Sequence, residues 1–577
     1  MLSSRTFSAD PLLRAIDADT DRISETRHSR DAAVVKVQRA LLLWDGGCLP
    51  KSGADGVYGD ETARAVVRYK IEVLSVSPPQ AFRDVGPLTV RSLDKRQADY
   101  EATIDLNARR AVMETWLGVP IHGYSTDPAD GTVIPHASGE SALRALKAAI
   151  DACTGPEDLI VLSGWSFNKD TSLEAGTSVE TSLRDASAQG VPIRALFAHA
   201  GTISVPLIGD VYLAGGSDNT WAVQFIRSLP TGIAIHDAWV LHADLAFGAQ
   251  AQTGTHHQKI WAIAHDASLT TFVGGIDIDR TRSPHDQPAG VLPWHDVQLE
   301  LLGDLATDAY RVLMDRWNSH PAKPAGSDLP FFLPPGTGGA QRGRTLATFG
   351  DPAAFAGLAG PPYPFASRGS KAVRTYLSYA ISRAEHFIYL EDQYLVDASI
   401  GRELAARMPA LDGLVIVIPP DNAINSEMHQ AGRRRRDVLT PLAPFMDKVA
   451  VVWSAQFVHS KLWIFDDDLA VVGSANSNRR GYSHDSEADV AFGDLIVPGA
   501  VSALRTQLWT RALGPLAPTA LSAPLSSVPI WKSATFAAGA HVEQYAPGID
   551  PEPVPAWASP FVGPDEFWDR VIDPQVP

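Results

Sequence analysis

The chain has 577 residues, of which 45% are hydrophobic and 20% charged, and its net charge is −17. This acidity argues against a general nucleic-acid binder, because such proteins gain affinity by neutralising phosphates with lysine and arginine. The length exceeds what one compact core accommodates, so we expect roughly two to four domains.

The N-terminus and the apolar runs bear on location. Residues 1–30 are charged throughout and lack the apolar segment of a secretory signal. No run is long and apolar enough to span a bilayer. We therefore expect a protein that is cytoplasmic in the producing cell, or one that a specialised secretion system exports without a cleavable signal. Cys48 and Cys153 are expected to be buried apolar residues, since two cysteines cannot build a disulfide framework.

The first hundred residues predict a small helical unit behind a flexible N-terminus at 1–30. Residues 32–44, AAVVKVQRALLLW, carry apolar side chains at helical spacing, and a glycine-rich turn then feeds a second helix. Residues 31–98 resemble a peptidoglycan-binding-like helical domain. The residues that carry this resemblance are Val35, Gln38, Leu41, the DGVYG stretch at 55–59, Thr62, Ala65, Val66 and Tyr69. The resemblance implies peptidoglycan as a partner, although such modules also serve as plain structural appendages.

From residue 99 the chain predicts a duplicated α/β architecture. A helix at 139–153 precedes buried strands at 158–167 and 192–199, and the same order returns with a helix at 369–387 and strands at 388–396 and 413–420. We expect two similar lobes related by a pseudo-twofold axis, at 99–320 and 365–515. A Pro/Gly-rich linker is expected at 321–364 and a C-terminal wrapping tail at 516–577, anchored by the aromatic residues of its closing EFWDRVIDP.

Each predicted lobe contains a histidine and a lysine two positions apart. His459 and Lys461 alternate with their neighbours along a predicted strand, so they project from one face. His257 and Lys259 have the same relation in the first lobe. Imidazole can act as nucleophile or acid, and ammonium can hold an anionic oxygen. Ser474 and Asn476, at the end of the returning strand, can donate further hydrogen bonds to that anion.

These stretches resemble the phospholipase D superfamily, whose mark is H-x-K-x4-D followed by a glycine-rich return. The second copy has every element of this pattern: His459, Lys461, Asp466, Gly473, Ser474 and Asn476. The first copy, HHQK followed by FVGGIDI, has His257, Lys259, Gly274 and Gly275. Further matches are PWHDVQLEL at 293–301, IYLEDQYL at 388–395 and the closing WDRVIDP.

The resemblance implies roles for these residues in phosphodiester cleavage without metal or cofactor. His257 is expected to be the nucleophile and His459 the general acid and base, with the reverse assignment left open. Asp296 is expected to orient His257, and Glu487 to orient His459. The lysines, Ser474, Asn476, Gly274 and Gly275 would hold the phosphate. Glu391 and Gln393 would contact the headgroup, or serve as a strand-end cap.

The motif acid Asp466 is expected to brace its hairpin rather than to take part in the chemistry. Its counterpart in the first copy is Ala264, and Asp266 could take its place. From His257 to Gly274 is seventeen positions, against fourteen from His459 to Gly473, so the first hairpin turn is expected to be longer.

Other residues near the two stretches are open to more than one interpretation. His256 is expected to be structural, because it points away from the face that His257 occupies. Trp165, Trp261 and Trp463 could line a pocket near the histidines. The run RRRR at 433–436 could grip phosphate, but a solvated helix face is the simpler interpretation.

Three functions remain open from the sequence. The favoured one is a phospholipase D that hydrolyses glycerophospholipids to phosphatidic acid at a phospholipid membrane surface. Paired with a wall-binding-like module, such an enzyme would suit an antibacterial or host-directed effector, with peptidoglycan or a secretion-system component as partner. The alternatives are a nuclease or other phosphodiesterase of the same superfamily, although no nucleic-acid partner is expected, and a non-catalytic binding or scaffold protein.

Overall fold

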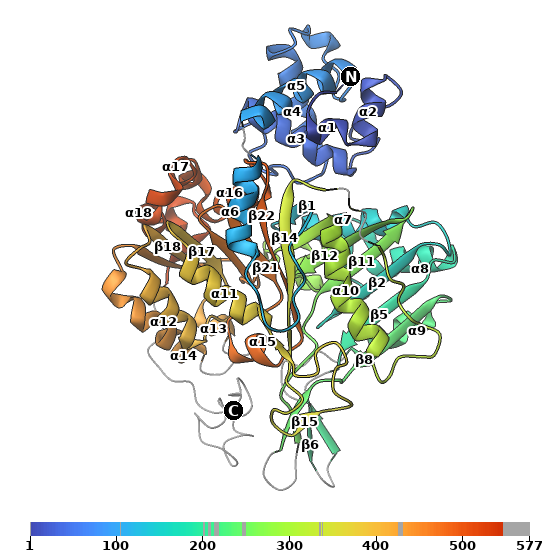
Figure 1. The fold of residues 1–577 in the computed structure, drawn as a ribbon, viewed down its shortest axis with the longest axis vertical. Helices are drawn as coiled ribbons and strands as arrows, with labels where there is room; N and C mark the ends of the chain where they lie inside the picture. The colour runs from blue at the N-terminus through green and yellow to red at the C-terminus, as the bar shows by residue number, and fades with distance from the viewer. Residues whose placement is uncertain are drawn as a thin grey trace.

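The molecule consists of two α/β lobes side by side, with a helical module packed at one end (Figure 1). The computed structural model describes residues 2–103, 106–199, 202–205, 209–212, 219–244, 250–333, 336, 338–424 and 431–545. The last part of the expected tail, including the closing aromatic residues at 567 and 568, lies outside these residues. No helix of the described part is both long and apolar enough to cross a membrane. Cys48 and Cys153 are buried and unbridged.

One large mixed sheet runs through both lobes, and its strand order contains the predicted pseudo-twofold symmetry. Strands β1 and β14 pair at the midline. Outward from this pair, lobe 1 adds β13, β12, β11, β2, β5 and β8, while lobe 2 adds β22, β21, β20, β17, β18 and β19. Each histidine stretch thus occupies the same place in its own half. The two-lobed mixed α/β architecture is confirmed.

The strands of lobe 1 are β1 (Ala129–His136), β2 (Leu159–Gly164), β5 (Ile193–Ala198), β8 (Gly232–Asp237), β11 (Ile260–His265), β12 (Ser268–Gly274) and β13 (Gln298–Gly303). Its helices are α7 (Gly139–Ala152), α8 (Val179–Ala188), α9 (Thr220–Ser228) and α10 (Asp304–Ser319). The small strands β3 (Ser172–Glu174) and β4 (Thr177–Ser178) form a separate hairpin.

The strands of lobe 2 are β14 (Gln341–Phe349), β16 (Ser370–Lys371), β17 (Phe387–Glu391), β18 (Gly413–Ile418), β19 (Val449–Ser454), β20 (Leu462–Phe465), β21 (Leu469–Gly473), β22 (Glu487–Asp494) and β23 (Val542–Gln544). Its helices are α6 (Leu106–Leu117), α11 (Ala372–Arg383), α12 (Ala398–Arg407), α13 (Asp421–Ile424), α14 (Ala431–Leu439), α15 (Arg479–Ser483), α16 (Ala500–Leu513), α17 (Ala517–Ser522) and α18 (Val528–Ser533).

Apolar side chains cover both faces of the sheet, which explains the continuous hydrophobic runs of strands such as β2 and β18. On one face α10 and α16 pack against a single core that extends under both lobes. On the other face each lobe has its own core, built with α7, α8 and α9 in lobe 1 and with α6, α11 and α12 in lobe 2. The shared core ties the two halves together.

Two expected boundaries are wrong. The segment 321–364, expected to be a linker, contains β14, a nine-residue central strand that pairs with both β1 and β22. The alternation in QRGRTLATF was missed because the Pro/Gly-rich residues before it dominate the composition. In the expected tail, the described residues 516–545 form α17, α18 and the edge strand β23, which extends the sheet beside β19.

The N-terminal module is larger than expected, because residues 2–30 are folded. Helices α1 (Arg5–Ser8) and α2 (Pro11–Asp17) bury Phe7, Leu13 and Ile16 in the same core as α3 (Ala32–Trp44), α4 (Asp60–Glu72) and α5 (Pro87–Thr103). The polar composition of this segment hid a few well-spaced apolar anchors. A patch of Val35, Ala54 and Ile134 joins the module to β1.

A small sheet projects from the opposite end of the molecule (Figure 1). Its strand order is β15 (Gly357–Leu358), β9 (Leu241–Asp244), β10 (Gln250–Gln252), β6 (Thr202–Val205) and β7 (Gly209–Tyr212).

The two histidine hairpins are closed by different turns. Asp466 accepts the backbone N–H groups of Glu385, His386 and Phe387 at 2.6, 2.7 and 2.8 Å, so its carboxylate ties the turn after β20 to the start of β17. These hydrogen bonds support the bracing role expected for Asp466, which stays a prediction. The expectation of a longer first turn is wrong: only Asp266 and Ala267 separate β11 from β12, and the extra residues lengthen the strands instead.

Lobe 1 also has a carboxylate that ties the two corresponding strands, but the carboxylate comes from the other strand of the pair. Ala264 lies within β11 and is 5% exposed, so it is a core residue rather than a turn residue. Asp266 does not replace the acid, because its side chain is 88% exposed. Asp158, just before β2, instead bonds to His265 Nδ1 at 2.9 Å and accepts hydrogen bonds from the backbone N–H groups of Thr154 and Gly155. The carboxylate that ties these two strands has moved to the other strand of the pair.

We predict that Asp466→Ala lowers the free energy of unfolding by about 2 kcal/mol more than Asp266→Ala, because only the first removes a charged acceptor shared by three backbone N–H groups. Asp466 and Asp266 have φ of 55° and 49°, so alanine meets the same left-handed strain at both positions. Urea unfolding of the two variants measures the difference. Equal losses would show that Asp466 braces nothing.

Candidate active site

The two histidine stretches meet where backbone bridges cross the lobe boundary. His257 N–H donates to the carbonyl of Ser486 at 2.9 Å, and His459 N–H donates to the carbonyl of His295 at 2.7 Å. His256 pairs with Ser486, and Val458 with His295, as isolated β-bridges. Each histidine of one lobe is therefore fixed by the segment that precedes the inner strand of the other lobe.

This arrangement corrects the expected partners of the histidines. His257 Nδ1 lies 3.0 Å from both carboxylate oxygens of Glu487, and His459 Nδ1 lies 2.7 Å from Asp296 Oδ2. The sequence suggested the opposite pairing, of each histidine with the acid of its own lobe. The cause is the crossing of the chain at the midline: each acid directly follows the residue that bridges to the opposite lobe.

Each lysine is held beside its own histidine. Lys259 Nζ donates to the His257 carbonyl at 2.9 Å and lies 3.3 Å from Asp277 Oδ2. Lys461 Nζ donates to Gln393 Oε1 at 2.9 Å and also to the carbonyl of His459. Burial lowers the pKa of Lys461 to about 8. The two ammonium groups are thus enclosed in the site, each already held by neighbouring oxygens.

Both histidines resist protonation in the unliganded site. Burial lowers the pKa of His257 well below its usual value, and the nearby charges of Lys259 and Lys461 lower it further. Burial has the same effect on His459, to which Arg282 and Lys461 add. In contrast, burial raises the pKa of Glu487 well above the usual value of a carboxyl. The local field therefore favours neutral imidazoles near pH 7.

Ser474 and Asn476, the two expected phosphate ligands, differ in their hydrogen bonding. Ser474 Oγ donates to Glu487 Oε2 at 2.5 Å and accepts the N–H of Ala488 at 3.0 Å, so it orients the partner of His257. The side-chain oxygen of Asn476 is buried and has no hydrogen-bond partner among the described residues. Of the two, only Asn476 keeps a polar group uncommitted.

Gly274 and Gly275 provide space for neighbouring groups of the site. A Cβ on Gly275 would stand 2.2 Å from Asp296 Oδ1, and one on Gly274 would stand 2.4 Å from the carbonyl of Val297. The missing side chains allow Asp296 to approach the end of β12, and the expected role of these glycines in substrate binding stays a prediction.

Glu391 and Gln393 also differ from expectation. Glu391 accepts hydrogen bonds from His295 at 2.6 Å and from Ser460 and Tyr389 at 2.5 Å each, all buried. It therefore belongs to a structural network that joins β17 to the WHD segment at 294–296, not to a headgroup site. Gln393 faces the site indirectly, through its bond to Lys461.

Aromatic rings flank the two histidines, and the sequence identified only one of them. The Trp165 ring lies 6.2 Å from His257, as the expectation of a pocket residue requires. Trp261 and Trp463 are core residues instead, 1% and 3% exposed. The ring that lies 5.6 Å from His459 is Trp294, which sequence analysis passed over although it stands two positions before Asp296.

Arginines contribute in ways that the sequence did not indicate. Arg282 Nε lies 3.3 Å from Asp296 Oδ2, and its guanidinium stands 4.5 Å from the Trp294 ring centroid. Within the RRRR run, Arg435 is fully buried and bonded to Asp421 and to backbone carbonyls, so the solvated face expected there does not include it.

His256, next to His257, points into a buried ion network, in keeping with its expected structural role. Its Nδ1 lies 3.3 Å from Asp237 Oδ2, and Asp237 forms a bidentate pair with Arg316 at 2.6 and 3.0 Å. Across the described residues, no group of three or more histidine, cysteine or acidic side chains is arranged to hold a metal ion.

Comparison with known proteins connects this geometry to one superfamily. Residues 377–504 match the family model described as cardiolipin synthase, PLD-like domain. Phospholipase D alpha 1 of Zea mays is 23% identical over an alignment that covers 45% of this chain and 49% of the relative. Phospholipase D alpha 1 of Vigna unguiculata is 23% identical, and the alignment covers 66% of this chain and 66% of the relative. Phospholipase D1 of Mus musculus is 25% identical, and the alignment covers 47% of this chain and 29% of the relative.

The alignments thus span from 29% to 66% of these relatives' own lengths. Among solved structures, phosphatidylserine synthase of Haemophilus influenzae Rd KW20 superposes with a TM-score of 0.46 at 10% identity, covering 69% of this chain and 89% of that one. Nuc of Salmonella typhimurium, a phospholipase D family member, superposes with a TM-score of 0.19 at 20% identity, covering 22% of this chain and 77% of that one. The family model and the curated relatives support the phospholipase D superfamily.

We predict that Glu391→Ala lowers the free energy of unfolding by about 3–5 kcal/mol, because it leaves His295, Ser460 and Tyr389 without their buried acceptor. Glu300→Ala is the matched control. Glu300 also pairs with a histidine, His136, but its side chain is 18% exposed, so the loss should be about 1 kcal/mol or less. Urea unfolding of the two variants gives the comparison, and a fully stable Glu391→Ala would return that residue to the candidate headgroup contacts.

Proposed function

We propose that the protein is a phospholipase D that hydrolyses the headgroup phosphodiester of a glycerophospholipid and releases phosphatidic acid. The observation that carries the proposal is the pair of enclosed imidazoles, each backed by a carboxylate of the opposite lobe and each beside a lysine. Two positioned imidazoles can divide one displacement at phosphorus into two easier ones, and two ammonium groups can neutralise the charge that builds on the phosphoryl oxygens.

In the first step of the proposed mechanism, His257 Nε2 attacks phosphorus. Its Nδ1 is engaged by Glu487, and its depressed pKa keeps the ring neutral, so a lone pair can form the P–N bond. The bond from phosphorus to the headgroup oxygen breaks, and that oxygen takes a proton from His459. A phosphatidyl-histidine remains on the enzyme, and the free headgroup alcohol leaves.

His459 must gain its proton when the substrate binds. Its pKa is held down by burial and by the positive charges of Arg282, Lys461 and Lys259. An anionic phosphodiester placed among these cations would offset their field, while Asp296 at 2.7 Å stabilises the imidazolium. Substrate binding would therefore create the acid that the first step requires.

In the second step the same residue acts as a base. His459, now neutral, takes a proton from water, and the oxygen of that water attacks phosphorus as the P–N bond to His257 breaks. Phosphatidic acid and the starting histidine result. We also expect the Asn476 amide to reach this site, where its N–H can donate to the phosphate and its oxygen, which has no partner among the described residues, can accept from the water.

The phospholipid substrate is favoured over nucleic acid by the net charge of −17 and by relatives that are named phospholipases D. The N-terminal module fits the proposal of an exported effector that binds peptidoglycan. Several residues of its motif are bonded to one another inside the module: Gln38 Nε2 donates to Asp55, Val57 and Thr62. These contacts support the resemblance in fold.

The proposal is tested by incubating the protein with phosphatidylcholine–phosphatidylethanolamine micelles and, separately, with plasmid DNA. We expect choline or ethanolamine release without nicking. We also expect His459→Ala to accumulate a covalent phosphatidyl adduct on His257 when the leaving alcohol is p-nitrophenol, which needs no acid to depart. His257→Ala should form none. Adduct in His257→Ala alone would reverse the two roles, and nicking without headgroup release would replace the lipid by nucleic acid.

The proposal also predicts a particular pH dependence. Lys461 is charged below its pKa of about 8, so kcat/KM, which reports the free enzyme, should fall as the pH rises through about 8. The depressed pKa of His257 places the acid limb below the usual value of 6.5. Lys461→Arg, which stays charged, should move the alkaline limb upward and leave the acid limb in place. An unmoved alkaline limb would assign it to another group.

A further inference from the structure

We propose that the mouth of the site docks on the surface of neutral phospholipid through two exposed apolar tips, Trp221 on one side and Val291 with Leu292 on the other. The inference rests on the proposed lipid substrate and adds how the enzyme reaches it. Each tip is connected by a short chain of contacts to one of the two histidines.

The tip on the His459 side is a short turn. Val291 and Leu292 are 52% and 53% exposed, and Val291 N–H donates to the carbonyl of Pro288 at 3.0 Å. Gly290 supplies the positive φ of 81° that this turn requires. The chain then reaches Trp294, whose ring lies 5.6 Å from His459. A closed turn thus exposes two large apolar side chains to solvent. They precede Trp294, whose ring lies beside His459, by three and two residues.

The tip on the His257 side is the start of α9. Trp221 is 79% exposed. Two residues earlier, Asn219 donates to the carbonyl of Trp165 at 2.8 Å and accepts the N–H of Phe167 at 3.2 Å. The Trp165 ring stands 6.2 Å from His257. Trp221 is therefore anchored to the same segment that forms the wall of the site.

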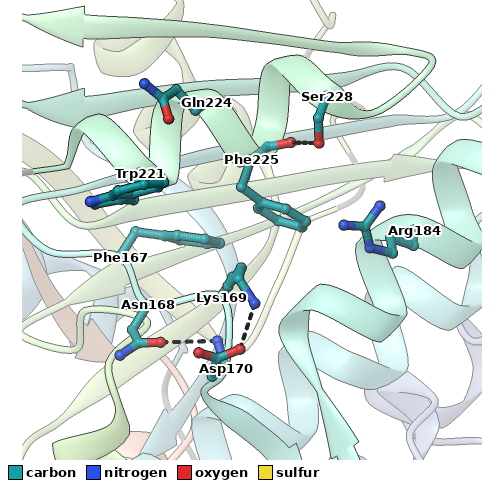
Figure 2. A pocket seen from close by; sticks show the side chains of 10 residues that line it. Phe167, Asn168, Lys169, Asp170, Arg184, Trp221, Gln224, Phe225 and Ser228 are labelled. Atoms are coloured by element: carbon teal, nitrogen blue, oxygen red, sulfur yellow. Dashed lines mark hydrogen bonds and ion pairs between the residues drawn. The ribbon is translucent and has the colours of Figure 1, made fainter.

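The pocket beside Trp221 has apolar side chains at its base, and the positive side chains around it are paired with negative ones. A pocket of about 560 Å³ opens beside it, with Phe167 and Phe225 as its floor (Figure 2). Lys169 pairs with Asp170 and Glu180 at 2.7 and 2.5 Å, and Arg184 pairs with Glu180 at 2.8 Å. The cations at this rim are matched by acids, so the surface is not built to collect phosphate or an anionic lipid.

These features favour neutral lipid as the occupant. Tryptophan prefers the interface between headgroups and acyl chains, and aliphatic side chains gain free energy when they leave water. The net charge of −17 opposes long-range attraction to an anionic membrane. The catalytic groups are enclosed, so a lipid must be raised partly out of its layer to reach them. Tips on both sides of the mouth would hold the enzyme where that happens.

The test compares two triple variants. Trp221→Ser/Val291→Ser/Leu292→Ser removes the tips. Phe82→Ser/Leu88→Ser/Leu333→Ser removes apolar side chains that are 70%, 71% and 80% exposed elsewhere. Phe82 and Leu88 belong to the N-terminal module. Leu333 is three residues before Gly336, whose N–H donates to Asp304. Asp304 follows the last residue of β13, whereas Asp296 of the site precedes the first. The second variant therefore controls for a general loss of exposed apolar surface.

The first measurement is cosedimentation with phosphatidylcholine vesicles at 0.5 M NaCl, roughly a Debye length of 4 Å, which suppresses electrostatic binding. We expect the tip variant to lose at least tenfold in vesicle partitioning and the control less than twofold. Equal partitioning of the tip variant and the wild type overturns the proposal. So does binding that requires phosphatidylglycerol and disappears with salt.

The second measurement separates this inference from the proposed activity. Hydrolysis of dihexanoyl phosphatidylcholine below its micellar concentration needs no surface. The tip variant should keep this activity within twofold of the wild type while losing at least tenfold on vesicles. A tip variant that loses both activities equally contradicts the docking role. A wild type that hydrolyses neither form disproves the phospholipase activity, while its cosedimentation still decides whether the tips bind lipid.

Discussion

The crosswise pairing of each histidine with a carboxylate of the other lobe is the constraint on which the site depends. Glu487 of lobe 2 lies against His257, and Asp296 of lobe 1 lies against His459. Neither half of the chain therefore contains both members of either of these two pairs. The alignment of the two lobes has to be accurate to a few tenths of an ångström, and the shared core beneath α10 and α16 supplies that rigidity.

The same constraint explains several features that at first look unrelated. Gly275 has no side chain because Asp296 occupies the place of its Cβ. Ser474 is committed to Glu487, and Glu391 is committed to His295, the residue whose carbonyl holds the backbone of His459. The polar residues that surround the histidines thus hold the two partners in register. Lys259 and Lys461 are also held by neighbouring oxygens, which fixes their positions beside the histidines.

The two braces show how a duplicated fold can keep a function while its residues change. In lobe 2 the acid lies in the hairpin and the N–H donors lie before β17, whereas in lobe 1 the acid lies before β2 and its histidine partner at the end of β11. The physical requirement is that a carboxylate ties the ends of two adjacent strands. Either strand can provide it, so the absence of an acid at Ala264 says little about the chemistry of that lobe.

The sequence by itself determined the two lobes, their symmetry, and the placement of His257 with Lys259 and of His459 with Lys461, because periodicity and spacing along a strand are local properties. It missed β14 and the folded N-terminus, where composition hid the pattern. Only the tertiary structure decided which acid serves which histidine, since that depends on the crossing of segments 230 and 163 residues apart. It likewise decided that Trp294, and not Trp261 or Trp463, stands beside a histidine. Contacts between distant segments leave no periodic trace in a single sequence, and they are what assembles this site.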